Sequence, residues 1–133
     1  MNLLLDTCAL LWALQAPDHL SLKARRALLN PSNPIHVSTV SFWEISLKFS
    51  LGKLTLENAV PGDFPQFVRD EGWHIEPLNA EAAAAFCALS RVSGHKDPFG
   101  RLLIHIAIRE GYHFVSRDAA AGHYADYGLR VCW

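Results

Sequence analysis

Short runs of consecutive hydrophobic residues recur along the chain, and stretches with helical periodicity separate them. The first run ends at Leu5 without any alternation of polar and hydrophobic positions, which is typical of a strand buried on both faces of a parallel sheet. Comparable runs predict further strands at 35–38, 73–76, 112–116 and 129–132. Helices are predicted over 8–14, 21–29, 40–51, 66–69, 82–89 and 98–109, and residues 61–65 are predicted to form a loop.

This alternation of strands and helices predicts the fold class. Strand–helix–strand units place parallel strands side by side through right-handed crossovers. We therefore expect an α/β fold, a three-layer α/β/α sandwich with a mostly parallel central sheet. At 133 residues the chain has the size of one domain, and no internal repeat or low-complexity tract divides it. A single domain over residues 1–133 is expected.

The composition narrows the class of protein. Hydrophobic residues make up 50% of the chain, and the mean hydropathy is slightly positive. No apolar run approaches the ~20 residues that span a bilayer, so we expect the excess apolar surface to face another protein and not a membrane. Asp6 interrupts the first apolar run, unlike a signal peptide, and a cytoplasmic protein is expected. The three cysteines, at positions 8, 87 and 132, are expected to be buried as small hydrophobic residues.

Four acidic residues lie where the predicted elements would bring them together. Asp6 and Asp118 directly follow predicted strands, Glu44 lies six residues after the second strand, and Asp97 opens a helix. The carboxyl ends of parallel strands meet at one edge of a sheet, which is where ligand sites form in such folds. Each acid has an alternative role, because an aspartate at the start of a helix often caps its N–H groups.

Four carboxylates in one crevice would repel one another and raise each other's pKa unless a divalent cation compensated their charge. Oxygen ligands without clustered His or Cys suit Mg²⁺ or Mn²⁺. Such an ion activates water and stabilises charge on a phosphodiester, which is the chemistry of a nuclease. The seven histidines lack metal-ligand spacing, and we expect them to be surface or satisfied core residues.

Four stretches of the chain resemble the PIN-domain toxins of VapBC toxin–antitoxin pairs: residues 4–12, 40–48 with 51–54, 95–104 and 115–118. The resemblance implies a Mg²⁺- or Mn²⁺-dependent endoribonuclease that a cognate antitoxin inhibits. It implies catalytic acids at Asp6, Glu44 and Asp118, with Ser116 at the position of a hydroxyl that helps to order the site. The metal is then expected on Asp6, Asp118 and, in part, Asp97.

One position departs from the family pattern. The family usually reads Asp-Pro-Phe-Asp-Arg where this chain has Asp97, Pro98, Phe99, Gly100 and Arg101, so the second acid is missing. A glycine in the first turn of a helix costs ~1 kcal/mol relative to alanine, and an acid there would be favoured by the helix dipole. We therefore expect a weakened or inactive site, in which Asp97 takes a catalytic or metal-binding role only in part.

The expected partners follow from the resemblance and from the charge. Ser116, Arg117, Lys96 and Arg101 are candidates for RNA contacts, with ordinary solvated charges as the alternative. The net charge of -1 argues against a broad basic face for duplex DNA, so operator DNA is expected only through the antitoxin. The antitoxin is expected on the apolar faces of the first helices, where Leu10, Leu11 and Leu14 recur, and a homodimer is expected.

Two other functions stay open. The chain could be a catalytically inactive module that binds an antitoxin and takes part in autoregulation, which Gly100 favours. It could also be a phosphoacceptor or phosphatase with a nucleophilic aspartate at the end of its first strand. The phosphatase pattern usually has a second acid two residues after the first, where this chain has Cys8.

Overall fold

The computed structural model describes residues 1–133 and contains one sheet of five strands. Every pair of neighbouring strands is parallel, in the order β3-β2-β1-β4-β5. The strands are short: β1 spans Leu3–Leu5, β2 Ile35–Ser38, β3 His74–Glu76, β4 His113–Val115 and β5 Arg130–Cys132. The five predicted strands and the parallel sheet are confirmed.

Six α-helices surround this sheet, and their bounds lie close to the predicted ones. They are α1 (Thr7–Gln15), α2 (Leu22–Leu29), α3 (Thr39–Ser50), α4 (Phe64–Asp70), α5 (Ala80–Ala85) and α6 (Pro98–Glu110). Four 3₁₀ helices complete the chain, at Pro17–His19, Pro61–Asp63, Phe86–Ala88 and Ala119–Tyr127. No helix has both the length and the apolar character needed to cross a bilayer.

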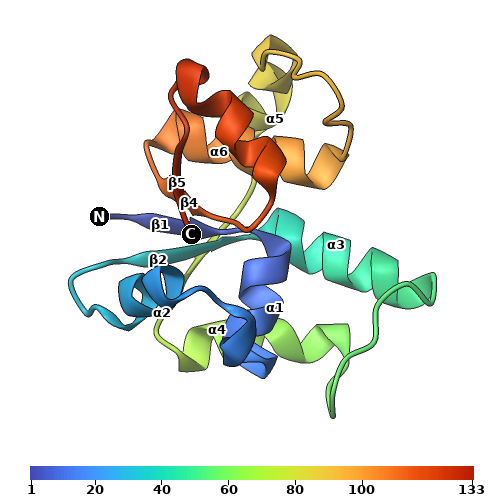
Figure 1. Cartoon of the computed structure of the whole chain (residues 1–133). Helices are drawn as coiled ribbons and strands as arrows, with labels where there is room; N and C mark the ends of the chain where they lie inside the picture. The colour runs from blue at the N-terminus through green and yellow to red at the C-terminus, as the bar shows by residue number, and fades with distance from the viewer.

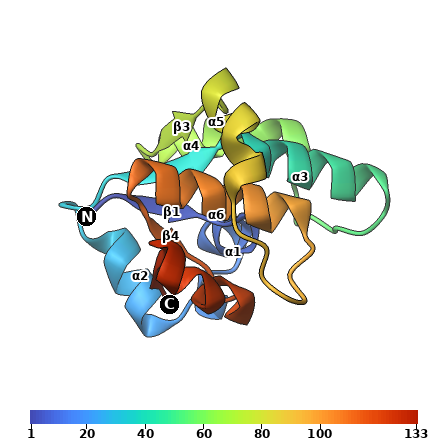
Figure 2. The same ribbon diagram turned by 90° about the horizontal axis from the view of Figure 1, so that it is seen from above.

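The helices form a layer on each side of the sheet. In Figure 1, α1, α2 and α4 lie below the strands, while α5, α6 and the red C-terminal segment lie above. Figure 2, seen from above, shows α6 crossing over β1 and β4. One buried cluster fills the side of α1, α2 and α4, and a second fills the side of α6. The expected three-layer α/β/α sandwich is confirmed.

Two local predictions were wrong at their boundaries. The predicted loop over 61–65 contains the start of α4, because Pro65 lies in the first helical turn, where its missing N–H leaves no bond unmade. The burial of Phe64 anchors this turn in the core. The helix predicted over 82–89 is α5 followed by a 3₁₀ turn, with Asn79 as its cap through a bond from Ala82 N–H (2.7 Å).

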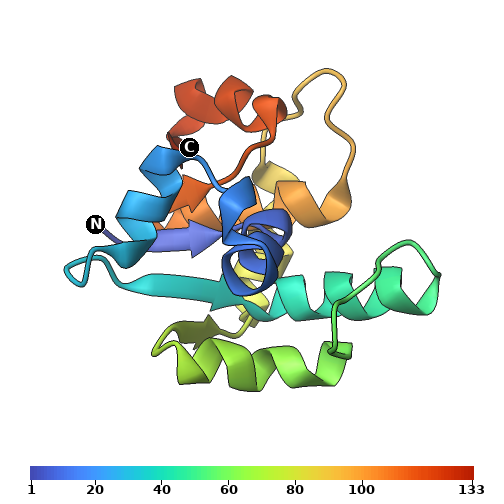
Figure 3. The same cartoon turned by 60° about the horizontal axis from the view of Figure 1, so that its bottom comes forward.

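The parallel sheet determines where the chemistry-bearing residues emerge. Leu5 pairs with Val115 at the carboxyl ends of β1 and β4, and Asp6 N–H donates to Val115 O at 3.0 Å. Figure 3 shows β1 and β2 pointing toward the same end of the sheet, where α1 and α3 begin. The residues that follow β1 and β4 therefore lie next to each other, although more than 100 positions separate them in the chain.

Candidate active site

A pocket of about 390 Å³ lies at the carboxyl ends of β1 and β4. Residues of α1, α3 and α6 supply the rest of its wall. The structure brings all four predicted acids to this pocket, together with the altered glycine and two of the candidate RNA contacts. The lining includes Asp6, Glu44, Asp97, Gly100, Ser116, Arg117 and Asp118.

Asp6 is both a helix cap and a member of the acidic group. Its Oδ1 accepts a hydrogen bond from Ala9 N–H at 2.7 Å, so the capping alternative is confirmed. Burial raises the pKa of Asp6 to about 6, although the hydrogen bonds from Ser116 and Ala9 lower it. The charges of Glu44 and Asp118 add to this increase. The fold therefore makes the Asp6 carboxylate harder to ionise than an ordinary aspartate.

Glu44 reaches the pocket from α3 and is only 6% exposed. The ammonium of Lys48, one turn later on the same helix, donates to Glu44 Oε2 in an ion pair. Burial disfavours the charged form of Lys48, but the contact with Glu44 and the charge of Asp97 outweigh it and raise its pKa. The chain thus supplies its own cation for this buried acid.

Ser116 and Asp118 follow β4 and form the opposite side of the pocket. The buried Ser116 Oγ accepts a hydrogen bond from Asp118 N–H at 3.0 Å. Asp118 Oδ1 accepts from Ala120 N–H at 2.9 Å and caps the 3₁₀ helix Ala119–Tyr127. The Asp118 side chain is 52% exposed, and its Oδ2 lies 3.7 Å from Nε2 of His95. One carboxylate oxygen of Asp118 is thus committed to the fold, and the other is not.

Asp97 caps α6 with both of its oxygens. Oδ1 accepts from Phe99 N–H and Oδ2 from Gly100 N–H, each at 3.2 Å, which confirms the predicted cap. A Cβ added to Gly100 would lie 2.9 Å from Asp97 Oδ2 and 3.4 Å from His95 Nε2. A side chain at position 100 therefore requires the Asp97 carboxylate to move, and the start of α6 is fitted to glycine.

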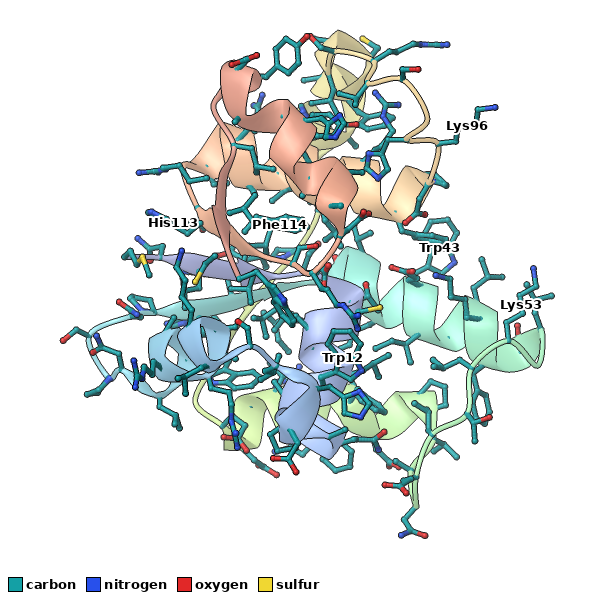
Figure 4. The ribbon with its side chains drawn as sticks, viewed as in Figure 1. Trp12, Trp43, Lys53, Lys96, His113 and Phe114 are labelled. Carbon is teal, nitrogen blue, oxygen red and sulfur yellow. The ribbon has the colours of Figure 1, made fainter.

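The predicted basic contacts divide between two places. Arg117 is exposed at the acidic pocket, with its guanidinium 5.9 Å from the ring of Trp12. Lys96 and Arg101 line a separate pocket formed by residues 91–96, and Arg101 Nη2 donates to Leu89 O at 3.4 Å. Figure 4 shows Lys96 extending from the loop before α6 away from the sheet. Only Arg117 of these three cations lies beside the acids, and the RNA contacts stay a prediction.

His95, for which no chemical role was predicted, lies beside the acids. Its ring is buried, Nδ1 is 2.8 Å from the hydroxyl of Tyr124, and Nε2 has no hydrogen-bond partner. The prediction that the histidines are surface or satisfied core residues was therefore wrong for His95, and also for His113, whose buried Nδ1 has no hydrogen-bond partner. No local pattern could have revealed this, because Tyr124 lies 29 positions further along the chain and Asp118 belongs to another element.

The cysteines differ from their predicted burial. Cys132 is buried, but Cys8 and Cys87 are exposed. Cys8 lies on the side of α1 that faces the pocket, so it packs against acids and not against the sheet. Although Cys8 is exposed, its thiol is partly desolvated by the surrounding residues, and this desolvation together with the charges of Asp6 and Glu44 raises the pKa of the thiol, which disfavours the reactive thiolate.

The donors around the pocket suit a hard divalent cation. Burial is the main cause of the raised pKa of Asp6, and the charges of Glu44 and Asp118 add to it, so a bound cation would stabilise the ionised form of Asp6. No three or more His, Cys, Asp or Glu side chains approach closely enough to hold an ion by themselves. Magnesium commonly binds through one or two carboxylates and keeps several waters, so an open group of this kind fits it.

Two apolar surfaces lie outside the acidic pocket. A groove of about 330 Å³ runs between α1, α2 and the start of β3, where Leu29 is 81% exposed. The second surface lies on α3, where Trp43 is exposed (Figure 4). Its ring packs edge-on against that of Phe99, with the ring centroids 5.1 Å apart. Leu10 does not contribute to either surface, because it is completely buried, so its predicted role in a partner contact was wrong.

Comparisons with known proteins agree with this architecture. The model of the PIN domain family matches residues 3–127. The fold is similar to the VapBC2 structure from Rickettsia felis bound to a promoter DNA fragment, with 15% identity over 98% of this chain and 97% of that one and a TM-score of 0.62. DNA-bound VapBC from Salmonella typhimurium gives 17% identity, coverage of 98% and 96% and a TM-score of 0.65.

A third similar structure is FitAB bound to an IR36 DNA fragment, with 17% identity, coverage of 97% of this chain and 92% of that one, and a TM-score of 0.60. No curated protein matches the chain significantly. Because their identities to this chain are low, the three structures establish only the fold. The family to which the chain belongs is established by the match over residues 3–127.

Proposed function

Because the chain belongs to the PIN domain family, we propose that it is the toxin of a type II toxin–antitoxin pair, an endoribonuclease that depends on Mg²⁺ or Mn²⁺ and is weakened at Gly100. PIN domains are generally nucleases and typically use divalent metal ions. One observation carries the proposal for this chain: Asp6, Glu44 and Asp118, which lie after β1, on α3 and after β4, line the same pocket.

The roles of the residues follow from their surroundings. Asp6, Asp118 and, in part, Asp97 would hold the ion, which when bound activates water and stabilises the charge on a phosphodiester. Ser116 orders the site by accepting Asp118 N–H and by its hydrogen bond to Asp6. Lys48 holds the Glu44 carboxylate in place. Arg117, exposed at the pocket, contacts RNA phosphates.

The proposed partners are an antitoxin protein, a second copy of the chain and an RNA substrate, all in the cytoplasm. Support for the antitoxin comes from the exposed apolar groove between α1 and α2 and from the similarity to three toxin–antitoxin structures. Operator DNA is contacted only through the antitoxin, since the chain carries a net charge of -1.

An inactive antitoxin-binding and autoregulatory module is the second candidate, and the surroundings of Gly100 favour it. The Asp97 carboxylate occupies space that a side chain at position 100 would need, with 2.9 Å between its Oδ2 and the added Cβ. The structure around position 100 thus fits glycine and not an acid, as expected for a protein that does not cleave RNA.

Cleavage of RNA in Mg²⁺ or Mn²⁺ separates the two candidates. The parent chain is expected to cleave slowly, and Gly100→Asp is expected to increase the rate by about 10²-fold, because a missing ligand misplaces the attacking water. Gly100→Ala is the matched control that adds the Cβ without the carboxylate, and it should stay slow. Adding Asp6→Asn to Gly100→Asp should abolish the gain.

The other outcomes also decide. Equal, fast cleavage by the parent and by Gly100→Asp would show that the site is complete without an acid at position 100. No cleavage by either protein, with tight binding of the antitoxin, would favour the autoregulatory module. A loss of antitoxin binding as well would exclude both candidates.

A further inference from the structure

The Nε2 atom of His95 is a buried polar atom without a hydrogen-bond partner, and it lies 3.7 Å from Oδ2 of Asp118, which lines the acidic pocket. The His95 side chain is only 6% exposed. Its other ring nitrogen, Nδ1, lies 2.8 Å from the Tyr124 hydroxyl, and Tyr124 is itself completely buried. A buried polar atom without a partner costs about 1–3 kcal/mol, so such atoms in folded proteins call for an explanation.

The distance to Asp118 excludes a direct hydrogen bond. His95 Nε2 and Asp118 Oδ2 are 3.7 Å apart, whereas an N–H···O bond needs about 2.7–3.2 Å. Two ligands that each lie about 2.1 Å from one ion are separated by about 3.0–4.2 Å, depending on the angle between them. The observed separation therefore suits two ligands of one ion better than a donor and an acceptor.

The nitrogen also lies beside the altered position. A Cβ at Gly100 would be 3.4 Å from His95 Nε2, so the ring faces the space that a side chain at this position would occupy. Gly100 and Asp118 both line the acidic pocket. The unpartnered nitrogen thus lies within 4 Å of both Oδ2 of Asp118 and the Cβ position of the missing acid.

We propose that His95 Nε2 and Asp118 Oδ2 are ligands of the divalent ion, so that the site of this chain is a mixed nitrogen–oxygen site and not a purely carboxylate one. This inference rests on the proposed function. Ligation through Nε2 requires the tautomer in which Nδ1–H donates a hydrogen bond to the Tyr124 hydroxyl, 2.8 Å away, and the lone pair is on Nε2, as a second hydrogen bond ensures for most histidine ligands.

A nitrogen ligand changes which ion the site prefers. Imidazole suits Zn²⁺ best among these ions, whereas Mg²⁺ strongly prefers oxygen; Mn²⁺ also favours oxygen ligands but, as a transition metal, accepts an imidazole nitrogen more readily than Mg²⁺ does. The chain is therefore expected to bind Mn²⁺ at least about tenfold more tightly than Mg²⁺, and Gly100→Asp is expected to narrow this difference by adding an oxygen ligand.

The test uses Mn²⁺ alone as the probe, with binding measured by calorimetry and the ligand atoms by pulsed electron paramagnetic resonance. The parent chain should show ¹⁴N coupling to the bound Mn²⁺. His95→Asn keeps a polar group near the Tyr124 hydroxyl but lacks Nε2, so it should lose the coupling and bind Mn²⁺ about 10-fold more weakly. His123→Asn, at an exposed histidine, is the matched control and should change neither.

A second measurement needs no substitution in the buried ring. Titration of the parent with Zn²⁺, followed by ¹⁵N NMR of the histidine rings, should shift one Nε2 resonance, that of the histidine whose Nδ1 proton contacts Tyr124. Tyr124→Phe should keep this shift but weaken ion binding about 10-fold, because the hydroxyl that orients the ring is absent.

Two negative results would be distinguishable, because one concerns the role of His95 and the other the metal dependence of the protein. An ion that binds without nitrogen coupling and without a ¹⁵N shift would overturn the role of His95 and leave the proposed nuclease intact. Failure of the parent and of Gly100→Asp to bind any divalent ion would contradict the metal dependence itself.

Discussion

The two walls of the acidic pocket are built in different ways. The inner wall consists of Asp6, between β1 and α1, with Glu44 and Lys48 on α3, and its carboxyl groups are largely buried. The outer wall consists of Asp97, Gly100 and Asp118 around the starts of α6 and the last 3₁₀ helix, and its acids are exposed. His95 lies directly outside this wall, with Nε2 3.7 Å from Asp118 Oδ2.

The difference concerns what the carboxylates do for the fold. On the outer wall, Asp97 and Asp118 cap helices, so their oxygens stabilise the structure. On the inner wall Asp6 also caps a helix, but burial outweighs this hydrogen bond and raises the pKa of Asp6 to about 6, so its ionised form opposes folding. Stability does not explain why a destabilising carboxylate is present, whereas a functional role does. The inner wall is therefore the stronger evidence for a functional site.

The largest expected effect is the pH-dependent stabilisation of the ion-free protein by Asp6→Asn. The unfolded chain ionises Asp6 near 3.8, the ordinary pKa of an aspartate, but the folded protein does so only at about 6. Stability is therefore lost as the pH rises between these values, and above about 6 the penalty is complete at roughly 3 kcal/mol. Asparagine does not titrate and still caps the helix.

At pH 7 the Asp6→Asn variant should thus be more stable than the parent by about 1–3 kcal/mol, with the difference vanishing near pH 4. Urea denaturation with a chelator across this range measures it. Asp118→Asn is the matched change on the outer wall, where the carboxylate is half exposed, and should stay within about 0.5 kcal/mol of the parent. An equal gain from both variants would erase the contrast between the walls.

A smaller effect, and of opposite sign, is expected from Lys48→Met: the protein loses stability because the buried Glu44 no longer has its ammonium partner. Removing one member of a buried ion pair costs about 3–5 kcal/mol. Because the Lys48 side chain is 42% exposed, we expect a loss of only about 1–2 kcal/mol. The double variant Glu44→Gln with Lys48→Met should recover most of it in chemical denaturation. Unchanged stability in Lys48→Met would mean that water already compensates Glu44.

The order of elements and the inner wall were predictable because local signals determine them. A continuous hydrophobic run before Asp6 indicated the buried strand β1, and the strand pattern before Asp118 placed both acids at one edge of the sheet. Parallel pairing follows from the connections between strands, so the convergence of distant residues could be inferred without coordinates.

The outer wall was less predictable because contacts between distant segments determine it. The missing acid at Gly100 was apparent from the motif, but the contact of its Cβ position with Asp97 depends on the cap rotamer. His95 lies next to Asp118 only because the loop before α6 folds over the 3₁₀ helix that carries Tyr124. Cys8 was misjudged because an apolar sequence neighbourhood does not say which side of α1 faces a pocket.

The smallest expected effect is an absence of stabilisation in Gly100→Ala. Replacing glycine by alanine inside a helix usually gains about 1 kcal/mol. Here the new Cβ would meet Asp97 Oδ2 at 2.9 Å, so the carboxylate must rotate and release Gly100 N–H, a loss of about 1 kcal/mol. The two changes offset each other, and thermal denaturation should give a difference within about 0.5 kcal/mol.

A double-mutant cycle isolates this contact. In the Asp97→Ala background no carboxylate opposes the Cβ, so Gly100→Ala should regain its full stabilisation and give a coupling energy of about 1 kcal/mol. Gly122→Ala, where nothing lies within 4 Å of the Cβ position, is the control and should be stabilising without Asp97→Ala. A full gain from Gly100→Ala in the parent would show that the Asp97 side chain yields freely. Gly100→Asp would then leave the helix cap formed by Asp97 intact. The outer wall would lack only this one carboxylate, and its structure would not oppose it.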